Sequence, residues 1–283
     1  MSTIYEDRPR VATQNAVKAD LNYLKAGQGR PVSFTYEPPP GVPWTYGELE
    51  AHKVEIHDAR SPDGDDDFSL DTSGFQYIQH KSALSDFSEE AAIRSIYYPE
   101  SEQVLLNATG AEKVVIFDHT LRDSEHGSRE TASLREPVRR VHNDQTFISG
   151  PRRARDHLPP EEAAERLNRR FAIINLWRPL AEIEQLPLAL CDARSISPND
   201  VIPGDLVYRD KVGETFSFTY NADHRWHYFP KLRPEEVLLL KIYDSRTDGT
   251  ARLTAHTAFE DPSTEANPAP RRSIELRALV FWR

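Results

Sequence analysis

Cysteine is nearly absent from this sequence. Cys191 is the only cysteine in 283 residues, so no disulfide can form within the chain, and a reducing compartment fits this composition. Cys191 directly follows three apolar residues, Leu188, Ala189 and Leu190. Because free cysteines are most often buried packing residues, we expect Cys191 to lie in the core rather than to act as a nucleophile.

Long apolar runs are also missing. No run approaches the roughly 18–20 residues that a helix needs to cross a bilayer. Residues 1–8 contain no apolar segment of the kind found in a secretory signal peptide. We therefore expect a cytoplasmic protein that does not interact with membranes.

Positive charge is in short supply as well. The chain has 35 Lys and Arg against 45 Asp and Glu, which gives a formal net charge of −10. Contacts to phosphates require a basic face, so we expect no nucleic-acid partner. The local arginine runs at residues 139–140 and 152–155 are interpreted as solvated charges rather than as a binding patch.

The residues that are present are typical of a folded globular protein. Apolar residues make up 38% of the chain and charged residues 28%, with 4 Trp, 11 Tyr and 12 Phe. This length allows a sizeable core, and all-β proteins of similar size are routinely one domain. We predict a single domain over residues 1–283, in which residues 1–50 form an arm packed on the main body.

Hydrophobic spacing predicts few helices. Apolar residues three and four apart predict a helix over residues 16–24. Ser88 is a suitable N-cap for a second helix, which Pro99 stops or kinks, and a third helix ends near Gly110. Residues 160–168 begin with proline and acidic residues, which is typical of a helix start.

Strands dominate from residue 171 onward. Their spacing of about ten residues, with turn signals between them, indicates a sandwich or barrel. The predicted strands cover residues 172–180, 188–192, 206–209, 215–220, 226–229, 235–244, 253–259 and 273–282, after earlier strands at 32–36, 54–60, 75–80, 113–118 and 137–144.

His142 and Asp144 on one predicted strand carry the main chemical signal. Residues two apart on a strand share a face. Two imidazoles and one carboxylate on one side of an iron ion form the 2-His-1-carboxylate facial triad, which leaves other coordination positions open. Chance alone gives roughly 1.6 His-x-acid matches at this composition, so the spacing needs support from elsewhere. A third ligand from a remote strand, for which we choose His256, requires a sheet that curls back on itself.

The support lies downstream of His256. Arg271 stands 15 positions later, and Ser273 shares its strand face. An arginine grips a carboxylate through two parallel charge-assisted hydrogen bonds. A dicarboxylate cosubstrate that chelates iron at one end needs such a clamp at its other end.

With these residues the chain resembles the iron(II)/2-oxoglutarate-dependent oxygenases, whose pattern is His-x-Asp, a distant His and then Arg-x-Ser. More narrowly, it resembles the AsaB-like and CmcJ-like hydroxylases and desaturases of secondary metabolism. The resemblance runs from about residue 20 to the C-terminus. It is carried by residues 54–60, 74–77, 141–145, 175–180, 191–195, 224–226, 241–245 and 271–279.

The resemblance implies a mainly β fold, a double-stranded β-helix or jelly roll with flanking helices. It implies iron(II) held by His142, Asp144 and His256, with Arg271 and Ser273 on the distal carboxylate of 2-oxoglutarate. The implied reaction uses dioxygen to oxidise a C–H bond of an amino acid or natural-product intermediate. Neither the outcome (hydroxylation, desaturation or ring closure) nor an oligomeric state is indicated by the sequence.

Several roles stay open at this point. His224 and His227 compete with His256 for the third ligand position, and His224 is otherwise a candidate substrate contact. Arg277 shares the strand face of Arg271 and is the alternative carboxylate clamp.

Further contacts are expected from residues near the pocket. Asn175, Trp177 and Arg178 lie on a strand that the resemblance places there, so we expect them to contact the substrate, although a core position would equally explain Trp177. Tyr220 is a candidate contact for the cosubstrate, with Tyr228 as a further aromatic candidate.

Two other functions fit the same residues. A cupin-like metalloenzyme would use His142, Asp144 and His256 without 2-oxoglutarate and would not need Arg271. A non-catalytic jelly roll would keep the histidine and aspartate as a structural pair and hold a small molecule in its pocket. The presence of both His-x-Asp and Arg-x-Ser argues against this second alternative.

Overall fold

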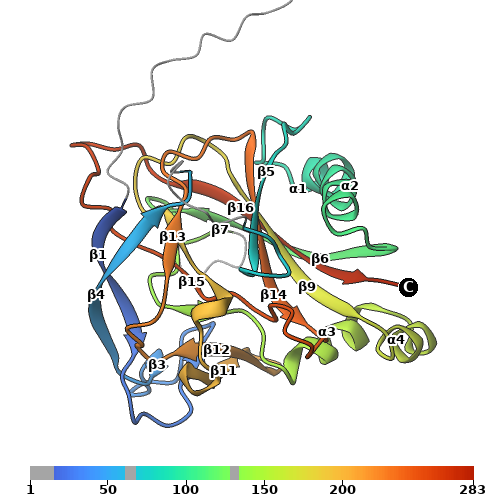
Figure 1. Cartoon of the computed structure of the whole chain (residues 1–283), viewed down its shortest axis with the longest axis horizontal. Helices are drawn as coiled ribbons and strands as arrows, with labels where there is room; N and C mark the ends of the chain where they lie inside the picture. Colours follow the sequence, from blue (N-terminus) through green and yellow to red (C-terminus); the bar gives the residue numbers. More distant parts are fainter. Residues whose placement is uncertain (1–15, 61–67, 128–133) are drawn as a thin grey trace, which may run out of the picture.

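The computed structural model describes residues 16–60, 68–127 and 134–283, whose strands form two sheets that curl toward each other (Figure 1). In this part of the chain the larger sheet has ten strands, in the order β1-β4-β13-β10-β15-β8-β12-β11-β2-β3. The smaller sheet has six, in the order β5-β14-β9-β16-β6-β7. The prediction of a mainly β jelly roll is confirmed.

The helices and strands have the following bounds. The strands are β1 (Ala16–Leu24), β2 (Val32–Phe34), β3 (Thr45–Tyr46), β4 (Leu49–Asp58), β5 (Phe75–Gln79), β6 (Lys113–Asp123), β7 (Leu134–Arg135), β8 (His142–Asn143), β9 (Phe171–Pro179), β10 (Leu188–Cys191), β11 (Val201–Val207), β12 (Val212–Phe218), β13 (Trp226–Tyr228), β14 (Glu236–Asp244), β15 (His256–Ala258) and β16 (Arg272–Phe281). The α-helices are α1 (Glu90–Ala92), α2 (Tyr98–Thr109), α3 (Ser149–His157) and α4 (Pro160–Arg166).

The inner faces of the two sheets enclose an apolar core. Leu188 and Leu190 of β10 pack there together with Leu240 of β14. Ala189 and Cys191 point to the opposite face, as the strand period of two requires. Cys191 is fully buried, which confirms its expected place in the core, and burial raises the pKa of its thiol to about 12.

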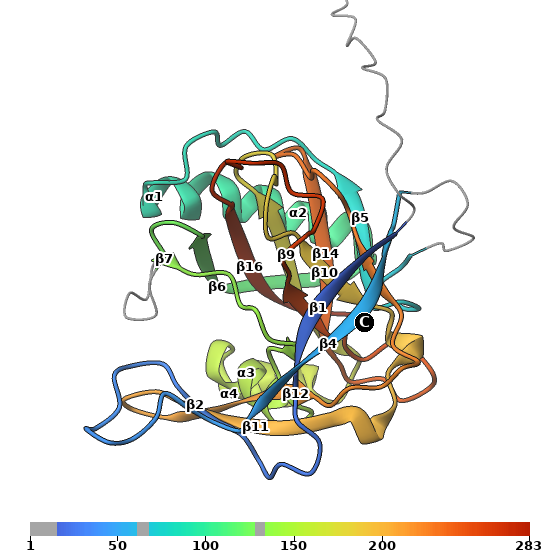
Figure 2. The same ribbon diagram turned by 90° about the vertical axis from the view of Figure 1, so that its left-hand side faces the viewer.

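Helix α2 covers the outer face of the smaller sheet (Figure 2). Pro99 lies in its first turn, directly after a π-helical turn at Ile93–Tyr97, so the chain departs from a regular α-helix where the proline was predicted to kink it. Gly110 ends α2 with φ +63°, a left-handed conformation that favours glycine.

Residues 16–24 form strand β1, so the predicted helix is wrong. The strand pairs with β4 along its whole length, and Val17, Ala19, Leu21 and Tyr23 are buried at every second position. This spacing of two competes with the helical spacing in the same residues, and the partner strand decides between them. The described part of the predicted arm, residues 16–50, therefore contributes strands to the larger sheet, while residues 1–15 lie outside the described part.

The inner face of β16 changes character along its length. Ser273, Glu275 and Arg277 form its first, polar half, and Leu279 and Phe281 join the apolar core. The polar half faces the region of β8 and β15, so the fold leaves a polar space at one end of an otherwise apolar interior.

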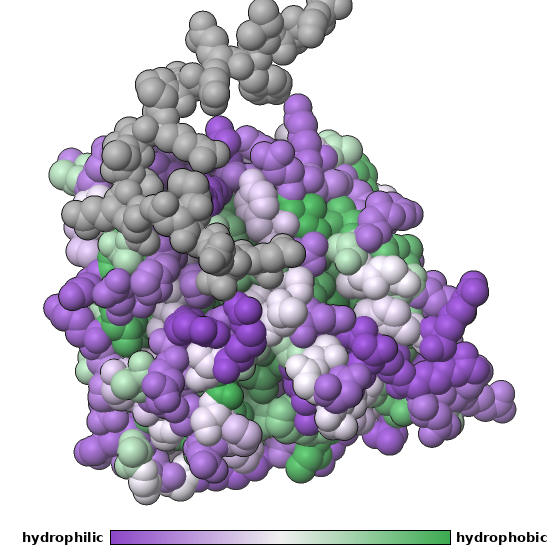
Figure 3. All heavy atoms as spheres, viewed as in Figure 1, coloured by the Kyte–Doolittle hydropathy of each residue, from purple (hydrophilic) through white to green (hydrophobic). Residues whose placement is uncertain are grey.

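The outer surface is mostly hydrophilic on the face shown in Figure 3, with hydrophobic residues visible in separate patches. Among the helices that the structure describes, none combines the length and apolar character needed to cross a membrane.

Candidate metal centre

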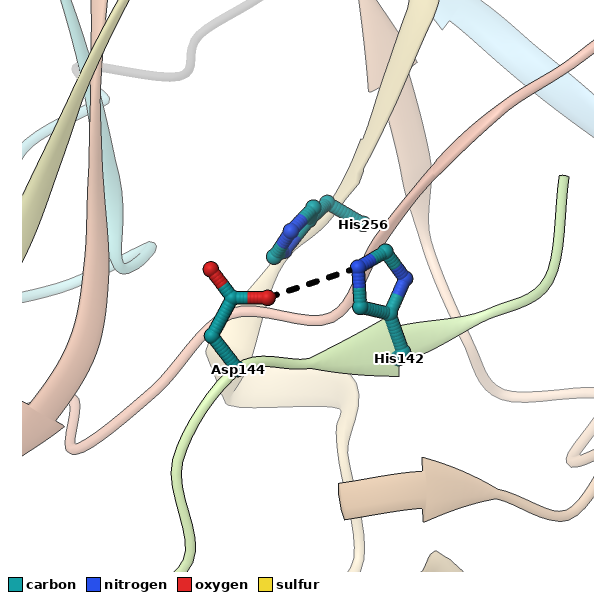
Figure 4. A group of neighbouring side chains, drawn as sticks. All are labelled: His142, Asp144 and His256. Atoms are coloured by element: carbon teal, nitrogen blue, oxygen red, sulfur yellow. Dashed lines mark ion pairs between the residues drawn. The ribbon is translucent and has the colours of Figure 1, made fainter. Parts of the chain in front are cut away.

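His142, Asp144 and His256 point toward one another from neighbouring strands (Figure 4). His142 of β8 and His256 of β15 are direct partners in the sheet register, and their ring centroids are 4.4 Å apart. Asp144 follows β8, and its Oδ1 lies 3.5 Å from Nε2 of His142. One ligand atom of each residue lies within 4.8 Å of the others. Two nitrogen donors and one oxygen donor on one side match the facial triad that binds iron(II).

Both histidines are oriented by the backbone in the same way. Nδ1 of His142 lies 2.9 Å from the carbonyl oxygen of Arg140, and Nδ1 of His256 lies 3.3 Å from that of Thr254. Since a carbonyl only accepts hydrogen bonds, Nδ1 carries the proton in each ring. Nε2 of each ring is then available to bind a metal ion.

The two oxygens of Asp144 have separate partners. Oδ2 accepts hydrogen bonds from Nδ2 of Asn175 at 2.8 Å and from Nε of Arg277 at 3.2 Å. Oδ1 instead faces His142. This division leaves one oxygen to bind a metal while the other holds the carboxylate in place.

The surroundings set the charge states that metal binding needs. Burial, together with the charge of His256, holds the pKa of His142 well below its usual range, so the ring is neutral. Burial would raise the pKa of Asp144, but the Arg277 guanidinium, the two histidines and the Asn175 hydrogen bond outweigh it, and this pKa is lowered. The site therefore offers a neutral imidazole at His142 and an ionised carboxylate at Asp144 at neutral pH.

A small cavity is lined by His142, His256, Arg271 and Trp177. The Arg271 side chain is buried, and Nη1 donates to the carbonyl oxygen of Leu186 at 2.5 Å. No carboxylate of the described residues forms an ion pair with it, and its Nε has no hydrogen-bond partner. Burial and the nearby Arg122 lower the pKa of Arg271 to about 9, so it still carries its charge at neutral pH.

Two further buried donors lie close to Arg271 and have no hydrogen-bond partner among the described residues. They are Nε1 of Trp177 and Oγ of Ser273. A buried charge is costly unless it is paired, and a carboxylate accepts several hydrogen bonds at once. These unpaired groups therefore fit the distal carboxylate of 2-oxoglutarate, whose other end would reach the histidines.

Arg277 is engaged elsewhere. Its guanidinium binds Asp144, Asp118, Glu275 and the hydroxyl of Thr120. Burial would lower its pKa, but the three carboxylates raise it well above the usual value. The geometry thus favours Arg271 over Arg277 as the clamp.

The strand that carries Asn175 and Trp177 turns Arg178 to the other side. Arg178 lies on the outer face of β9, where it donates to the Tyr97 hydroxyl at 3.1 Å and to the His80 carbonyl at 2.7 Å. One step along a strand reverses the side-chain direction. Arg178 consequently does not line the small cavity beside Arg271.

The structure does not bring Tyr220 or His224 to the metal cluster. Tyr220 stacks on His52 with ring centroids 3.9 Å apart. His224 lies between the Tyr23 hydroxyl at 3.2 Å and the Asp200 carboxylate at 3.1 Å. Neither residue lines the small cavity or the larger one that opens in front of His142 and Asp144.

His227 shares the sheet row of His256 but is separated from it. Leu190 of β10 pairs with His256 on one side and with His227 on the other. Of the three competing histidines, only His256 therefore lies beside His142.

A larger cavity, of ≈ 920 Å³, opens in front of His142 and Asp144. Its wall includes residues of β6, β7 and the segment 136–140 that leads into β8. From the sequence we expected substrate contacts on β9 and at His224, and none on this wall. The only available signal was a polar alternation in β6, which is equally typical of a solvated strand edge.

Comparison with known proteins agrees with this geometry. The family model described as "YDMC: Oxidoreductase/YMDC permease-like domain" matches residues 21–281. "Hydroxylase/desaturase CTB9" from Cercospora beticola is 33% identical over 256 residues, which cover 83% of this chain and 78% of that protein. "Fe(II)/2-oxoglutarate-dependent dioxygenase nvfI" from Aspergillus novofumigatus (strain IBT 16806) is 32% identical over 266 residues, covering 90% and 92%.

A solved structure extends the similarity to the fold. The "iron and alpha-ketoglutarate-dependent endoperoxidase NvfI" superposes with a TM-score of 0.84 at 28% identity, over 95% of this chain and 99% of that one.

Proposed function

This chain belongs to the family of iron(II)/2-oxoglutarate-dependent oxygenases, and from that membership we propose which residues perform each task. The enzyme uses iron(II), 2-oxoglutarate and dioxygen to oxidise a small molecule. We assign the iron to His142, Asp144 and His256, and the distal carboxylate of 2-oxoglutarate to Arg271 and Ser273.

The observation that carries this assignment is the relation of Arg271 to the histidines. The Arg271 guanidinium, which is buried and has no counter-ion among the described residues, lines the same small cavity as His142 and His256. A cupin-like enzyme that does not use 2-oxoglutarate would have no need for this costly charge. The unpaired arginine therefore supports the cosubstrate, and not only the metal.

The iron centre, loaded with 2-oxoglutarate and dioxygen, supplies the oxidising chemistry. The residues of the chain hold and orient the reactants. Asn175 and Arg277 fix the free oxygen of Asp144, and the carbonyls of Arg140 and Thr254 fix the histidine rings.

The cosubstrate cavity must widen as it fills. Its free volume is ≈ 10 Å³, which is about the space of one water molecule. Arg122 and Glu275 belong to its wall and are 3.7 Å apart, which is a loose ion pair. Their side chains are the ones that we expect to move.

We assign the substrate to the larger cavity of ≈ 920 Å³. This volume is at the upper end of the range for small-molecule sites, which suits a natural-product intermediate of several rings better than a single amino acid. Hydroxylation, desaturation and ring closure are all compatible with a C–H bond presented to the iron.

We further propose that the enzyme works in the cytoplasm with neither nucleic acid nor membrane as a partner. The buried single cysteine fits a reducing compartment, and the net charge of −10 disfavours phosphate-rich partners. Localisation of a fluorescent fusion expressed in a fungal host tests the compartment.

Anaerobic titration with iron(II) and then 2-oxoglutarate tests the assignment. We expect a visible charge-transfer band that is lost in His142→Ala and weakened in Arg271→Ala. His57→Ala is the matched control, because this histidine is half-exposed on β4 and does not line the metal cluster. Iron binding without any band would favour the cupin-like alternative. No iron binding at all would favour a non-catalytic jelly roll.

A further inference from the structure

The larger cavity has a charge balance opposite to that of the molecule. The chain carries a net charge of −10, yet six arginines and four carboxylate residues line this cavity. An excess of positive charge in a concave site attracts anions. Whether an arginine is available to a ligand depends on whether it already has a partner.

Most of these arginines are engaged within the protein. Arg277 binds three carboxylates, and Arg122 donates to the carbonyl oxygen of Glu136 at 3.0 Å. Arg139 pairs with Glu260 at 2.7 Å. Of the two others, Arg140 donates to the hydroxyl of Ser33 at 2.9 Å, and Arg153 lies 3.9 Å from Asp156.

Arg135 is different. Within the described residues it forms no ion pair and no side-chain hydrogen bond, and its Nε is a buried donor without a partner. The residue is partly buried in the cavity wall, and this burial lowers the pKa of its guanidinium. A half-buried charge without a counter-ion destabilises the empty protein.

The strand pairing of Arg135 places it beside another positive charge. Arg135 of β7 is the direct partner of Arg122 of β6, which in turn pairs with Ser273 of β16. Like charges directly opposite each other on neighbouring strands repel. Arg135 therefore stands one strand beyond Arg122, at the edge of the sheet whose centre carries the cosubstrate residues.

We propose that Arg135 binds a carboxylate group of the substrate and so selects a monoanionic substrate. The proposal rests on the function assigned above and names the substrate class of the same site. The guanidinium fork matches a carboxylate through two parallel hydrogen bonds. A single unpaired arginine balances one negative charge, whereas a phosphate ester would bring nearly two. The bound anion also lies beside Arg122 and relieves the repulsion between the two arginines.

Binding to paired acids and esters tests this inference. The wild-type protein is loaded anaerobically with iron(II) and 2-oxoglutarate, then titrated with phenylacetate, 1-naphthylacetate and indole-3-acetate and with their methyl esters. Quenching of tryptophan fluorescence and change of the charge-transfer band give the dissociation constants. We expect each acid to bind at least about tenfold more tightly than its ester, because a hydrogen bond to a charged group contributes that much.

Three variants separate specific from general effects. In Arg135→Gln each acid and its ester should bind with about equal dissociation constants. Arg135→Lys should keep part of the preference for the acid. Arg169→Gln removes the same charge from an exposed residue paired with Glu165 and should keep the full preference. Arg135→Gln should also unfold at an equal or higher temperature than the wild type, since it removes an unpaired charge.

The outcomes are distinct. Equal binding of acids and esters by the wild type, or an unchanged preference in Arg135→Gln, overturns the proposal. A weaker 2-oxoglutarate affinity in Arg135→Gln with the acid preference intact would instead assign Arg135 to the cosubstrate. Loss of the charge-transfer band in the wild type would refute the iron and 2-oxoglutarate assignment, while the fluorescence titration would still report on the anion site.

Discussion

At the scale of single residues, the metal centre depends on how Asp144 is held. Its Oδ2 has two donors, Asn175 and Arg277, while Oδ1 faces the histidines. From the sequence we expected Asn175 to contact the substrate. Its position behind the carboxylate instead indicates that it orients a metal ligand.

Replacing Asn175 by leucine should therefore affect the metal. Leucine has a similar shape but donates no hydrogen bond, so we expect iron(II) affinity to fall by about 10- to 100-fold, as for other partners of metal ligands. Anaerobic iron titration measures this, with the exposed Asn199→Ala as control. Unchanged iron affinity combined with a raised KM for the substrate would support the role expected from the sequence.

We expect Arg271 to lower the stability of the protein without ligands and to be required for binding 2-oxoglutarate. Replacing it by methionine removes a buried charge that has no carboxylate partner in the described part of the chain, so the free energy of unfolding without ligands should stay equal or rise by about 1 kcal/mol. Binding of 2-oxoglutarate should be lost. Chemical denaturation and isothermal titration measure the two effects, and a clear loss of stability without ligands would indicate a structural role instead.

At the scale of elements, strand periodicity explains both the successes and the failures of sequence reading. Each strand from β9 to β16 overlaps a predicted strand, because these segments alternate or are continuously apolar, but the prediction at 206–209 shares only residues 206 and 207 with β11. In residues 16–24 the apolar positions fit both the strand spacing of two and the helical spacing of three and four. The pairing with β4 makes this segment a strand. Arg178 was expected beside Trp177, but adjacent residues on β9 face opposite sides of the sheet.

Gly74 directly precedes β5 and packs closely against neighbouring segments. Its φ is +82°, and an added Cβ would lie 2.9 Å from the carbonyl oxygen of Leu253. Gly74→Ala should therefore lower the free energy of unfolding by more than about 2 kcal/mol, combining backbone strain with a close contact.

Gly249 provides the matched control for this substitution. It has φ +99°, but an added Cβ would meet nothing within 4 Å. Gly249→Ala should cost only the backbone strain, about 1–2 kcal/mol. Equal losses in the two variants, measured by urea denaturation, would mean that the contact with Leu253 contributes nothing.

At the scale of the whole molecule, the site is assembled from both sheets. The motifs were sufficient to propose the three iron ligands and Arg271, because His-x-Asp and Arg-x-Ser are short local patterns in the sequence. The sequence could not predict that Asp144 binds Arg277 or that Arg271 binds the carbonyl of Leu186. Each pair joins residues more than 80 positions apart, and their contact depends on how distant segments pack. The wall that carries Arg135 was hidden for the same reason.

This assembly predicts how the ligands stabilise the protein. His142 and His256 belong to the larger sheet, whereas Arg271 directly precedes β16 of the smaller one, so iron with 2-oxoglutarate would connect the two. A ligand that binds only the folded state adds about 2.7 kcal/mol of stability at a hundredfold excess over its Kd. We expect 2-oxoglutarate to raise the Tm strongly only when a divalent metal is present. Anaerobic thermal unfolding should show that His256→Ala loses both increments and Arg271→Ala only the second. An equal rise with 2-oxoglutarate alone would mean that the cosubstrate binds away from the metal, against the bridge between the sheets.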